Sequence, residues 1–541
     1  MFILRRKKRL SSFSSVGALI PGRTFFNLSY SKKFNCDMGK LIPIMCDEVV
    51  PGDVFKIGND FTIRFEPLIS PVMEDIYARV LYFFVPYRLL KRDCLGDMNG
   101  AGSVNGDTFD WEDFLAQGKD GKTITQVLPR WIPTKNTKYS LWDYLGFPVG
   151  ISPAGAYPLN FPREAYNFVW NEWFRNENID DEVSLDNEDI LNIRWNRDYF
   201  TAALPFQQKG TAPVLSGDIL YEGSDDYYHP VNIFSTYNSG QQPLAVAVGG
   251  SSVATALVNG NKELYHVAAG TVSSNGGISP KDGASQVVYG GFNIAQLRLC
   301  VQTQKWLERN ARAGTRYTEL LRSHFGVSPT DARLDRPEYI GGSKTPIIVS
   351  EVLQTSASPL DGESGSPQGT MAGHGISIDR NYVAKYRVEE YGLILGLLCV
   401  APKHGYGGQG INRQWLRRDR LDFYFPEFAH LSEQGIETAE IYATDSEANN
   451  TDLFGYIGRY DEMRHKQDMC CADFRAEYQD WTLNEFYETK PLLNSSFVEA
   501  NVRKNIFAVR NFPGIKVNFG NVIHAYRPLP LIGEPGLVDH F

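Results

Sequence analysis

Residues 40–88 read KLIPIMCDEVVPGDVFKIGNDFTIRFEPLISPVMEDIYARVLYFFVPYR, and this stretch decides the fold. In FTIRFE, residues 61–66, apolar and polar side chains alternate, and this period of two predicts a strand with one buried face. Residues 76–85 are almost continuously apolar, which is typical of a strand that is covered on both sides. Residues 50–53, VPGD, indicate a turn. We therefore expect adjacent strands of a thick β-structure here.

A second group of strand patterns appears after residue 344. The candidates are 345–354, 382–388, 391–401, 421–425, 440–444, 453–459 and 517–526. Strands separated by long connections favour an antiparallel sandwich or jelly roll over repeated βαβ units. Because the early strands need the late ones as partners, the intervening segments are expected to be insertions into one barrel.

Helices are expected in three places within these insertions. Residues 140–146 begin with a serine suited to capping and end with a glycine. Residues 162–175 carry a proline at the start and an aromatic stripe at helical spacing, which predicts packing rather than a ligand site. Residues 293–325 form a basic helical segment interrupted by Gly314. Its cations face either solvent or the phosphates of a nucleic acid.

Composition limits the class of protein. Fifty-four Lys and Arg against 63 Asp and Glu give a net charge of −9, so the surface as a whole does not suit nucleic acid. A hydrophobic content of 43% and a charged content of 22% are typical of a soluble globular chain. No apolar run reaches the roughly 20 residues that span a bilayer. The seven cysteines show no CxxC, which argues against a disulfide framework or a zinc site and favours a reducing cytoplasm.

The N-terminus departs from this acidic balance. Residues 1–23 contain five consecutive cations, which are Arg5, Arg6, Lys7, Lys8 and Arg9. No apolar segment of signal-peptide type follows them. The arm either contacts phosphates without sequence preference or is a solvated terminus.

Catalytic patterns are weak. Residues 405–410, GYGGQG, match GxGxxG, but neither a long helix nor a buried parallel strand follows, as a dinucleotide site requires. The nine histidines show no metal-ligand spacing, and no nucleophile elbow is present. We expect no catalytic residue, no cofactor and no metal site. The oxidoreductase class therefore depends on this glycine motif alone.

Tryptophan supports a competing class, a carbohydrate-binding or carbohydrate-active β protein. The side chains that are candidates for a sugar groove are Trp131, Trp142, Trp170, Trp173, Trp195, Trp306, Trp415 and Trp481. A hydrolase would also need a pair of facing carboxylates, which the sequence does not place.

Several motifs, in order, resemble the gokushovirus major capsid protein family of the Microviridae. They include LIPIMCDEVVPGDVF (41–55), LYFFVPYR (81–88), REAYNFVWNEWFR (163–175), RWNRDYFTAALPFQQKG (194–210), QKWLERNARAGTRYTELLRSHFGVSPTDARLDRPEYIGG (304–342) and PGLVDHF (535–541). The resemblance covers nearly the whole chain. It implies an eight-stranded antiparallel jelly roll with large loop and helix insertions.

The resemblance also implies a function and partners. The chain would be a structural protein of the virion, not an enzyme, made in the host cytoplasm. It would assemble with itself into a T=1 icosahedral shell of about sixty copies around single-stranded DNA. Implied partners are internal scaffolding, DNA pilot and small basic DNA-binding proteins and a host-surface receptor.

Together these patterns divide the chain into six segments. They are a basic arm (1–23), first jelly-roll strands (24–89), an insertion with helices (90–217), a Gly/Ser-rich surface insertion (218–291), a helix-rich segment (292–343) and the remaining strands with a C-terminal arm (344–541). By resemblance, the segment 218–291 would protrude at the three-fold axis.

Overall fold

The computed structural model describes most of the chain. The described residues are 22–90, 92–93, 108–109, 111, 128–131, 136–152, 155–213, 219–221, 244–248, 252–258, 264–268, 271–272, 287–289, 294–313, 316–328, 330–353, 371–431 and 433–532. The chain divides into two compact units. Gly210–Leu307 form one, and Met1–Lys209 with Glu308–Phe541 form the other.

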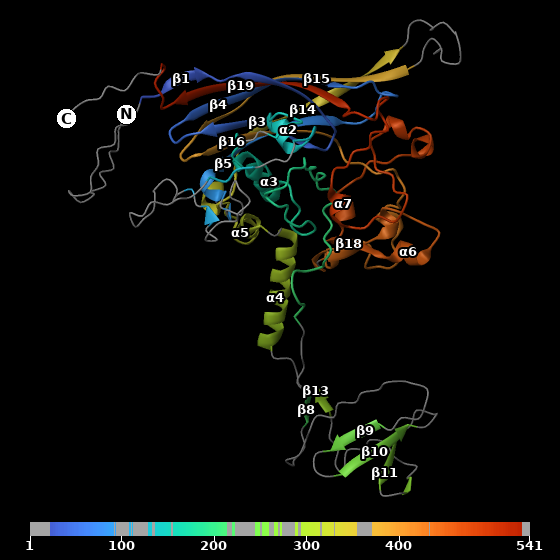
Figure 1. Cartoon of the computed structure of the whole chain (residues 1–541). Helices are drawn as coiled ribbons and strands as arrows, with labels where there is room; N and C mark the ends of the chain where they lie inside the picture. The colour runs from blue at the N-terminus through green and yellow to red at the C-terminus, as the bar shows by residue number, and fades with distance from the viewer. Residues whose placement is uncertain are drawn as a thin grey trace, which may run out of the picture. The chain divides into compact units, whose positions relative to one another are not determined.

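The larger unit is built on one antiparallel sheet (Figure 1). Its strands are β1 (Thr24–Asn27), β2 (Tyr30–Cys36), β3 (Leu41–Val49), β4 (Val54–Phe65), β5 (Ile76–Pro86), β14 (Glu338–Leu353), β15 (Met371–Arg387), β16 (Gly392–Pro402) and β19 (Ile515–Arg527). They follow the order β1-β19-β4-β15-β14-β5-β16-β3. Because β1 and β2 pair with opposite ends of β19, the nine strands fill eight positions. The sheet curls into a half-barrel, which confirms the predicted mainly β, jelly-roll-like fold.

In this sheet every early strand pairs only with late strands. β5 lies between β14 and β16, and β4 lies between β15 and β19. The prediction that long segments are inserted into one barrel is confirmed. The prediction that residues 40–88 form adjacent strands is wrong, because β15 and β14 separate β4 from β5 and β16 separates β5 from β3. Apolar patterning specifies which faces are buried, but it does not specify the partner strand.

The core lies inside the curl. Phe61, Ile63 and Phe65 of β4 are buried, and the intervening Thr62 and Arg64 face outward, as the alternation predicts. From Tyr82 onward every residue of β5 is buried. Phe83 contacts Trp173, with ring centroids 5.4 Å apart, and Phe84 contacts Tyr386 on the other side at the same distance. The second half of β5 is therefore covered on both faces.

The two predicted helices of the first insertion are confirmed. In α2 (Leu141–Leu145) the hydroxyl of Ser140 accepts the Asp143 N–H at 3.2 Å, and Gly146 ends the helix at a φ of 98°. In α3 (Phe161–Trp173) the aromatic stripe packs against the barrel, where the Tyr166 hydroxyl donates to the Leu41 carbonyl at 2.9 Å. The segment 293–325 contains two helices, over residues 294–313 and 317–325, and Gly314 lies outside the described residues.

The other elements are short apart from α4. The helices are α4 (Ile294–Ala313), α5 (Tyr317–Phe325), α6 (Glu447–Thr451) and α7 (Ser495–Val498). The 3-10 turns are η1 (Tyr87–Leu89), η2 (Asp331–Leu334), η3 (Arg413–Trp415), η4 (Phe428–His430), η5 (Thr438–Glu440), η6 (Asp461–Met463), η7 (Ala472–Arg475) and η8 (Gln479–Trp481). Two-stranded sheets pair β17 (Glu433–Glu437) with β18 (Leu453–Gly458), and β6 (Arg92–Asp93) with β7 (Thr108–Phe109).

Two predicted strands are wrong. Residues 421–425 form turns, in which the Asp422 carboxylate accepts the N–H groups of Arg418 and Asp419 at 2.8 and 3.3 Å. Glu440 ends the 3-10 turn η5, and residues 441–444 form no strand. Side-chain bonds to the local backbone compete with sheet pairing, and the apolar pattern does not report them. The other five candidates after residue 344 are confirmed as β14, β15, β16, β18 and β19.

The smaller unit contains short strands. They are β8 (Ile219–Tyr221), β9 (Leu244–Val248), β10 (Ser252–Val258), β11 (Leu264–Ala268), β12 (Thr271–Val272) and β13 (Val287–Tyr289). β12-β11-β10-β9 form one antiparallel sheet, and β13 pairs with β8. Most of the Gly/Ser-rich segment 218–291 lies outside the described residues.

Candidate assembly and nucleic-acid surfaces

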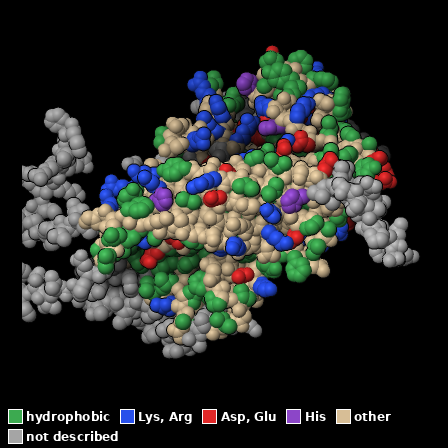
Figure 2. Space-filling model, turned by 90° about the horizontal axis from the view of Figure 1, so that it is seen from above, with side chains coloured by type: hydrophobic (Ala, Val, Ile, Leu, Met, Phe, Trp, Pro, Cys, Tyr) green, Lys and Arg blue, Asp and Glu red, His purple; other side chains and the backbone are tan. Residues whose placement is uncertain are grey.

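The outward side of the β2-β19-β4-β15 part of the sheet carries a cluster of cations, which we call the basic face. Its members are Lys33, Lys56, Arg64, Arg380, Lys385, Arg387 and Lys516. Figure 2 looks onto the molecule from above the sheet and shows Lys and Arg side chains spread across it. Lys516 pairs with Glu66 at 2.6 Å. Among the described residues, the other six form no ion pair, although the protein as a whole is acidic.

Strand register places like charges opposite one another on the basic face. Lys56 lies across from Lys385, and Arg64 lies across from Lys516. Such pairs destabilise a sheet by a few tenths of a kcal/mol or more. An anionic partner would relieve the repulsion at these two pairs, while Arg380 lies across from the carboxylate of Asp60.

Aromatic side chains are interleaved with these cations. Tyr382 is 67% exposed and Phe25 is 46% exposed. Phe25 also contacts Tyr526, over whose ring the Lys56 ammonium lies at 5.6 Å. Cations mixed with exposed rings are the usual surface for single-stranded nucleic acid, whose bases stack while its phosphates pair.

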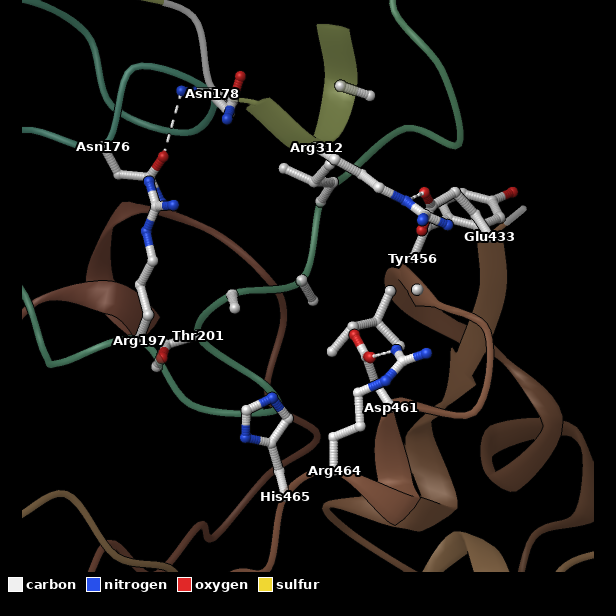
Figure 3. A pocket seen from close by; sticks show the side chains of 16 residues that line it. Asn176, Asn178, Arg197, Thr201, Arg312, Glu433, Tyr456, Asp461, Arg464 and His465 are labelled. Carbon is white, nitrogen blue, oxygen red and sulfur yellow. Dashed lines mark hydrogen bonds and ion pairs between the residues drawn. The ribbon is translucent and has the colours of Figure 1, made fainter. Parts of the chain in front are cut away.

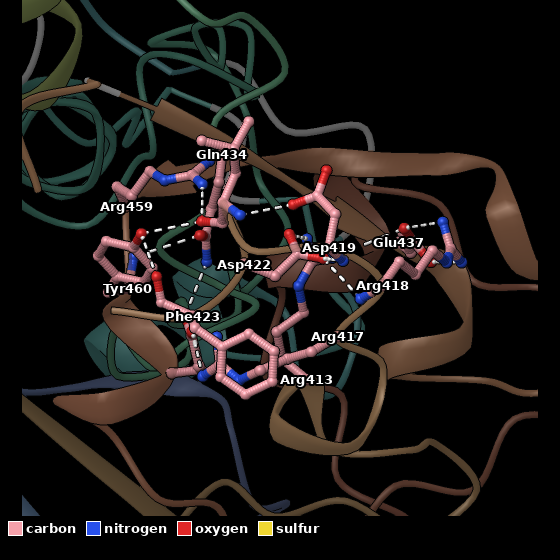
Figure 4. A network of polar contacts seen from close by, with 12 residues as sticks. Arg413, Arg417, Arg418, Asp419, Asp422, Phe423, Gln434, Glu437, Arg459 and Tyr460 are labelled. Carbon is pink, nitrogen blue, oxygen red and sulfur yellow. Dashed lines mark hydrogen bonds and ion pairs between the residues drawn. The ribbon is translucent and has the colours of Figure 1, made fainter. Parts of the chain in front are cut away.

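A second surface is the aromatic loop, residues 411–431, and Figure 4 shows the polar contacts around its residues 413–423. Trp415, Phe423, Tyr424 and Phe425 are 75%, 55%, 52% and 48% exposed. Apart from the short turns η3 and η4, the loop is irregular. Four large aromatic side chains thus remain in contact with solvent in one segment.

Polar contacts hold the backbone of the aromatic loop. The Tyr460 hydroxyl lies 2.9 Å from the carbonyl oxygens of both Leu421 and Phe423, and Arg459 donates to the same Leu421 carbonyl. Arg418 forms two hydrogen bonds with the Glu437 carboxylate, at 2.9 and 2.7 Å. We call Glu437, Arg459 and Tyr460, with their bonds to the loop, the frame. The frame holds the backbone of the aromatic loop in one conformation.

A buried ion pair lies at the centre of this frame. Arg417 Nη2 is 3.1 Å from Glu462 Oε1, and the two side chains are only 9% and 5% exposed. The other Glu462 oxygen accepts from Gln434 Nε2 at 2.8 Å. The Arg417 guanidinium also lies 5.5 Å from the Phe423 ring centre, so it joins the frame to the exposed surface.

A cleft of about 330 Å³ opens beside the end of α4 (Figure 3). Its charges are largely compensated, since Arg312 pairs with Glu433 and Arg464 pairs with Asp461. Arg197 and His465 also line it. Within the described residues, no group of three His, Cys, Asp or Glu side chains is arranged to hold a metal. The cleft shows no catalytic constellation.

Packing accounts for the glycines of the GxGxxG motif. A Cβ on Gly405 would lie 2.0 Å from Asn484 Oδ1, one on Gly407 would lie 2.3 Å from the Phe486 ring, and one on Gly410 would lie 2.1 Å from the Glu440 carbonyl oxygen. The motif is followed by the three-residue turn η3 instead of a long helix. These glycines allow close approach between chain segments.

His404, next to this motif, lies between two carboxylates. Its Nδ1 is 2.7 Å from Asp198 Oδ2, its Nε2 is 3.5 Å from Glu485 Oε2, and Trp195 stacks on its ring at 4.4 Å. Burial lowers the pKa of His404, but the two carboxylates raise it more, to about 9. The histidine is thus a buried cation at neutral pH.

This arrangement predicts that the subunit loses stability at alkaline pH. Because the folded pKa of about 9 exceeds the ordinary 6.5, the stabilisation is complete below pH 6.5 and is lost as pH rises through 9. The loss should approach about 3 kcal/mol. Urea unfolding of wild type and His404→Gln at pH 6, 7.5 and 9.5 measures it. The difference between the two proteins should shrink with pH, and a constant difference would contradict the assignment.

The residues singled out from sequence have different locations. Arg5, Arg6, Lys7, Lys8 and Arg9 lie outside the described residues. Of the tryptophans proposed for a sugar groove, Trp131, Trp142, Trp170 and Trp195 are buried, and only Trp306 and Trp415 are more than half exposed. Sequence reasoning missed both surfaces described here. For the first, the sequence signal is limited to Lys385 and Arg387, which alternate in one strand, and for the second it is the FYF run at 423–425.

These features define a class: a structural protein that associates with partners through exposed surfaces. Residues 14–537 match the family model of the capsid protein (F protein), so the chain belongs to this family of phage capsid proteins. It is 29% identical to capsid protein VP1 of Chlamydia phage 1, with 97% of both chains covered. It is 30% identical to VP1 of Bdellovibrio phage phiMH2K over 98% of both chains, and 27% identical to VP1 of Spiroplasma virus 4 over 93% of both.

Membership confirms the resemblance to the gokushovirus major capsid protein. The chain is a capsid protein of a small phage with a single-stranded DNA genome, and it is a virion component that assembles with itself into a shell. It is not an enzyme. Among the described residues, no helix is both long and apolar enough to cross a membrane.

Proposed function

We propose that the chain forms a T=1 icosahedral shell of about sixty copies around packaged single-stranded DNA. The observation that carries the nucleic-acid part is the basic face, six of whose cations lack an ion-pair partner among the described residues of an acidic protein. Expression with the phage partners, followed by electron microscopy, tests the shell. Particles of another symmetry, or none, would refute it.

DNA would contact the shell at two places. The N-terminal arm supplies Arg5, Arg6, Lys7, Lys8 and Arg9, and the basic face supplies cations and rings on a rigid sheet. Each phosphate contact releases counterions, so binding should be independent of sequence and weaken with salt. Exposed rings such as Tyr382 add base stacking.

Neutralising the basic face should weaken DNA binding. We expect Lys33→Gln/Arg64→Gln/Arg380→Gln to lower the affinity of subunits for a single-stranded oligonucleotide and to flatten the salt dependence by about 2 in log–log slope. Fluorescence anisotropy across a salt series measures both quantities. The control removes three exposed cations elsewhere, Lys138→Gln/Lys466→Gln/Arg510→Gln, and should leave the slope nearly unchanged. If the two triple variants gave equal salt-dependence slopes, the proposed binding of DNA by the basic face would be refuted.

The same assay separates the arm from the sheet. A variant with glutamine at all five arm positions should lose a comparable part of the slope if the arm contacts phosphates. An unchanged slope would leave the arm as a solvated terminus.

The remaining partners are proposed from the family. The segment 218–291 would project at the three-fold axis and contact the host-surface receptor, and scaffolding, pilot and small basic DNA-binding proteins would join during assembly. Replacing 218–291 with a short Gly/Ser linker should then give particles that no longer adsorb to host cells. Normal adsorption by such particles would refute the receptor role.

A further inference from the structure

The aromatic loop presents an unusual combination of order and exposure. Its backbone is fixed by Tyr460, Arg459 and Asp422, yet its largest side chains face solvent. A loop that is already fixed loses little conformational entropy when a partner covers it. The local contacts therefore favour association at this surface over burial within the subunit.

The aromatic loop has the amino-acid composition that is typical of the buried centre of a protein–protein interface. Trp, Tyr, Phe and Arg are the residues enriched in such centres and in their energetically dominant positions. Trp415 is the most exposed of its four exposed aromatic side chains, and the exposed Arg418 and Arg420 lie between it and Phe423 in the sequence. Lysine is absent from residues 411–431.

The area also fits a protein partner. With the side-chain areas typical of these residues, the four exposed rings present roughly 400–500 Å² of apolar surface. That is about half of what each partner buries in an interface of standard size. It also falls within the range of about 300–600 Å² for the largest apolar patch of a typical monomer, a patch that is often functional.

Because a capsid protein assembles with itself, a second copy of the chain is the expected partner of the aromatic loop. Each subunit of a shell must cover part of its neighbours, and contacts around a closed ring join different surfaces of successive copies. We propose that the aromatic loop, with Trp415 and Phe423–Phe425 at its centre, seats against a neighbouring copy of this chain in the shell.

Photo-crosslinking identifies the partner directly. With a benzophenone amino acid in place of Phe423, irradiated particles should give a product with the mass of two chains. The same substitution at Tyr382, on the basic face, should give much less of it. A product with another phage protein, or no product from intact particles, would overturn the proposal.

Substitution tests the contribution to assembly. Trp415→Ser/Phe423→Ser/Phe425→Ser should reduce the yield of particles at least tenfold, while the subunit stays soluble with nearly unchanged thermal unfolding. The matched control is Phe325→Ser/Phe512→Ser, two side chains that are 72% and 61% exposed outside both the loop and the basic face. The single variant Trp415→Ser shows the same effect more weakly if the triple variant unfolds.

The outcomes separate this inference from the proposed shell. If wild type gives no icosahedral particles, the proposed T=1 architecture is refuted. The crosslinking experiment is then carried out on the assembly that wild type does form. If wild type and the loop triple variant assemble equally well, the shell stands and the loop contact is refuted.

Discussion

Replacing Phe84 with Asp is expected to leave no soluble protein. Phe84 is 1% exposed in β5, which lies between β14 and β16 in the sheet. Its ring packs against Tyr386 from the neighbouring part of the curl. A carboxylate here would lose its hydration without gaining a partner, and it would also leave the space of the ring unfilled. The combined cost of at least about 5 kcal/mol equals the whole stability of many domains.

The measurement is the soluble fraction after expression, with two matched variants. Tyr382→Asp places the same charge in the same sheet at a position that is 67% exposed, and it should remain soluble. Phe84→Leu keeps the site apolar and should lower the unfolding temperature without loss of soluble protein. Phe83→Asp should fail like Phe84→Asp, since Phe83 is 2% exposed against Trp173. Soluble, assembling Phe84→Asp would place β5 at the periphery and refute the half-barrel core.

Local patterns in the sequence predicted local structure well. The alternation at 61–65 specified the buried face of β4, and Ser140 with Gly146 specified both ends of α2. Each of these depends on neighbours within a few residues. The strand order does not, and the expected adjacency within 40–88 was therefore wrong: β4 takes its partners from β15 and β19, far along the chain.

The same distinction explains what was missed in the sites. No short window of sequence contains the basic face, because Lys33, Lys56, Arg380 and Lys516 come from four strands and meet only through the register. The aromatic loop was mistaken in part for a strand, because LDFYF has the composition of one. What prevents a strand there is the set of bonds from Asp422, Arg459 and Tyr460 to the loop backbone, and two of these side chains lie more than thirty residues later.

The frame under that loop gives the second large expected effect. Arg417→Met should destabilise the subunit by about 3–5 kcal/mol, because it leaves the Glu462 carboxylate buried without its cation. Arg418→Met is the natural control. Arg418 is the next residue along the chain, its side chain is 59% exposed, and its pair with Glu437 should contribute only about 0–1 kcal/mol. Urea unfolding of both variants at neutral pH measures the difference.

A third variant separates the charge from the shape of the pair. In Arg417→Met/Glu462→Met both charges are gone, so no buried carboxylate is left unpaired, and the loss should be smaller than for Arg417→Met alone. Gln434 loses its acceptor in that variant, so the loss is not expected to vanish. Because Arg417 also packs on Phe423, the single variant should loosen the aromatic loop and lower particle yield even where the subunit remains folded. If Arg417→Met costs no more than Arg418→Met, the pair is not the centre of the frame, and the loop must be held by Tyr460 and Arg459 alone.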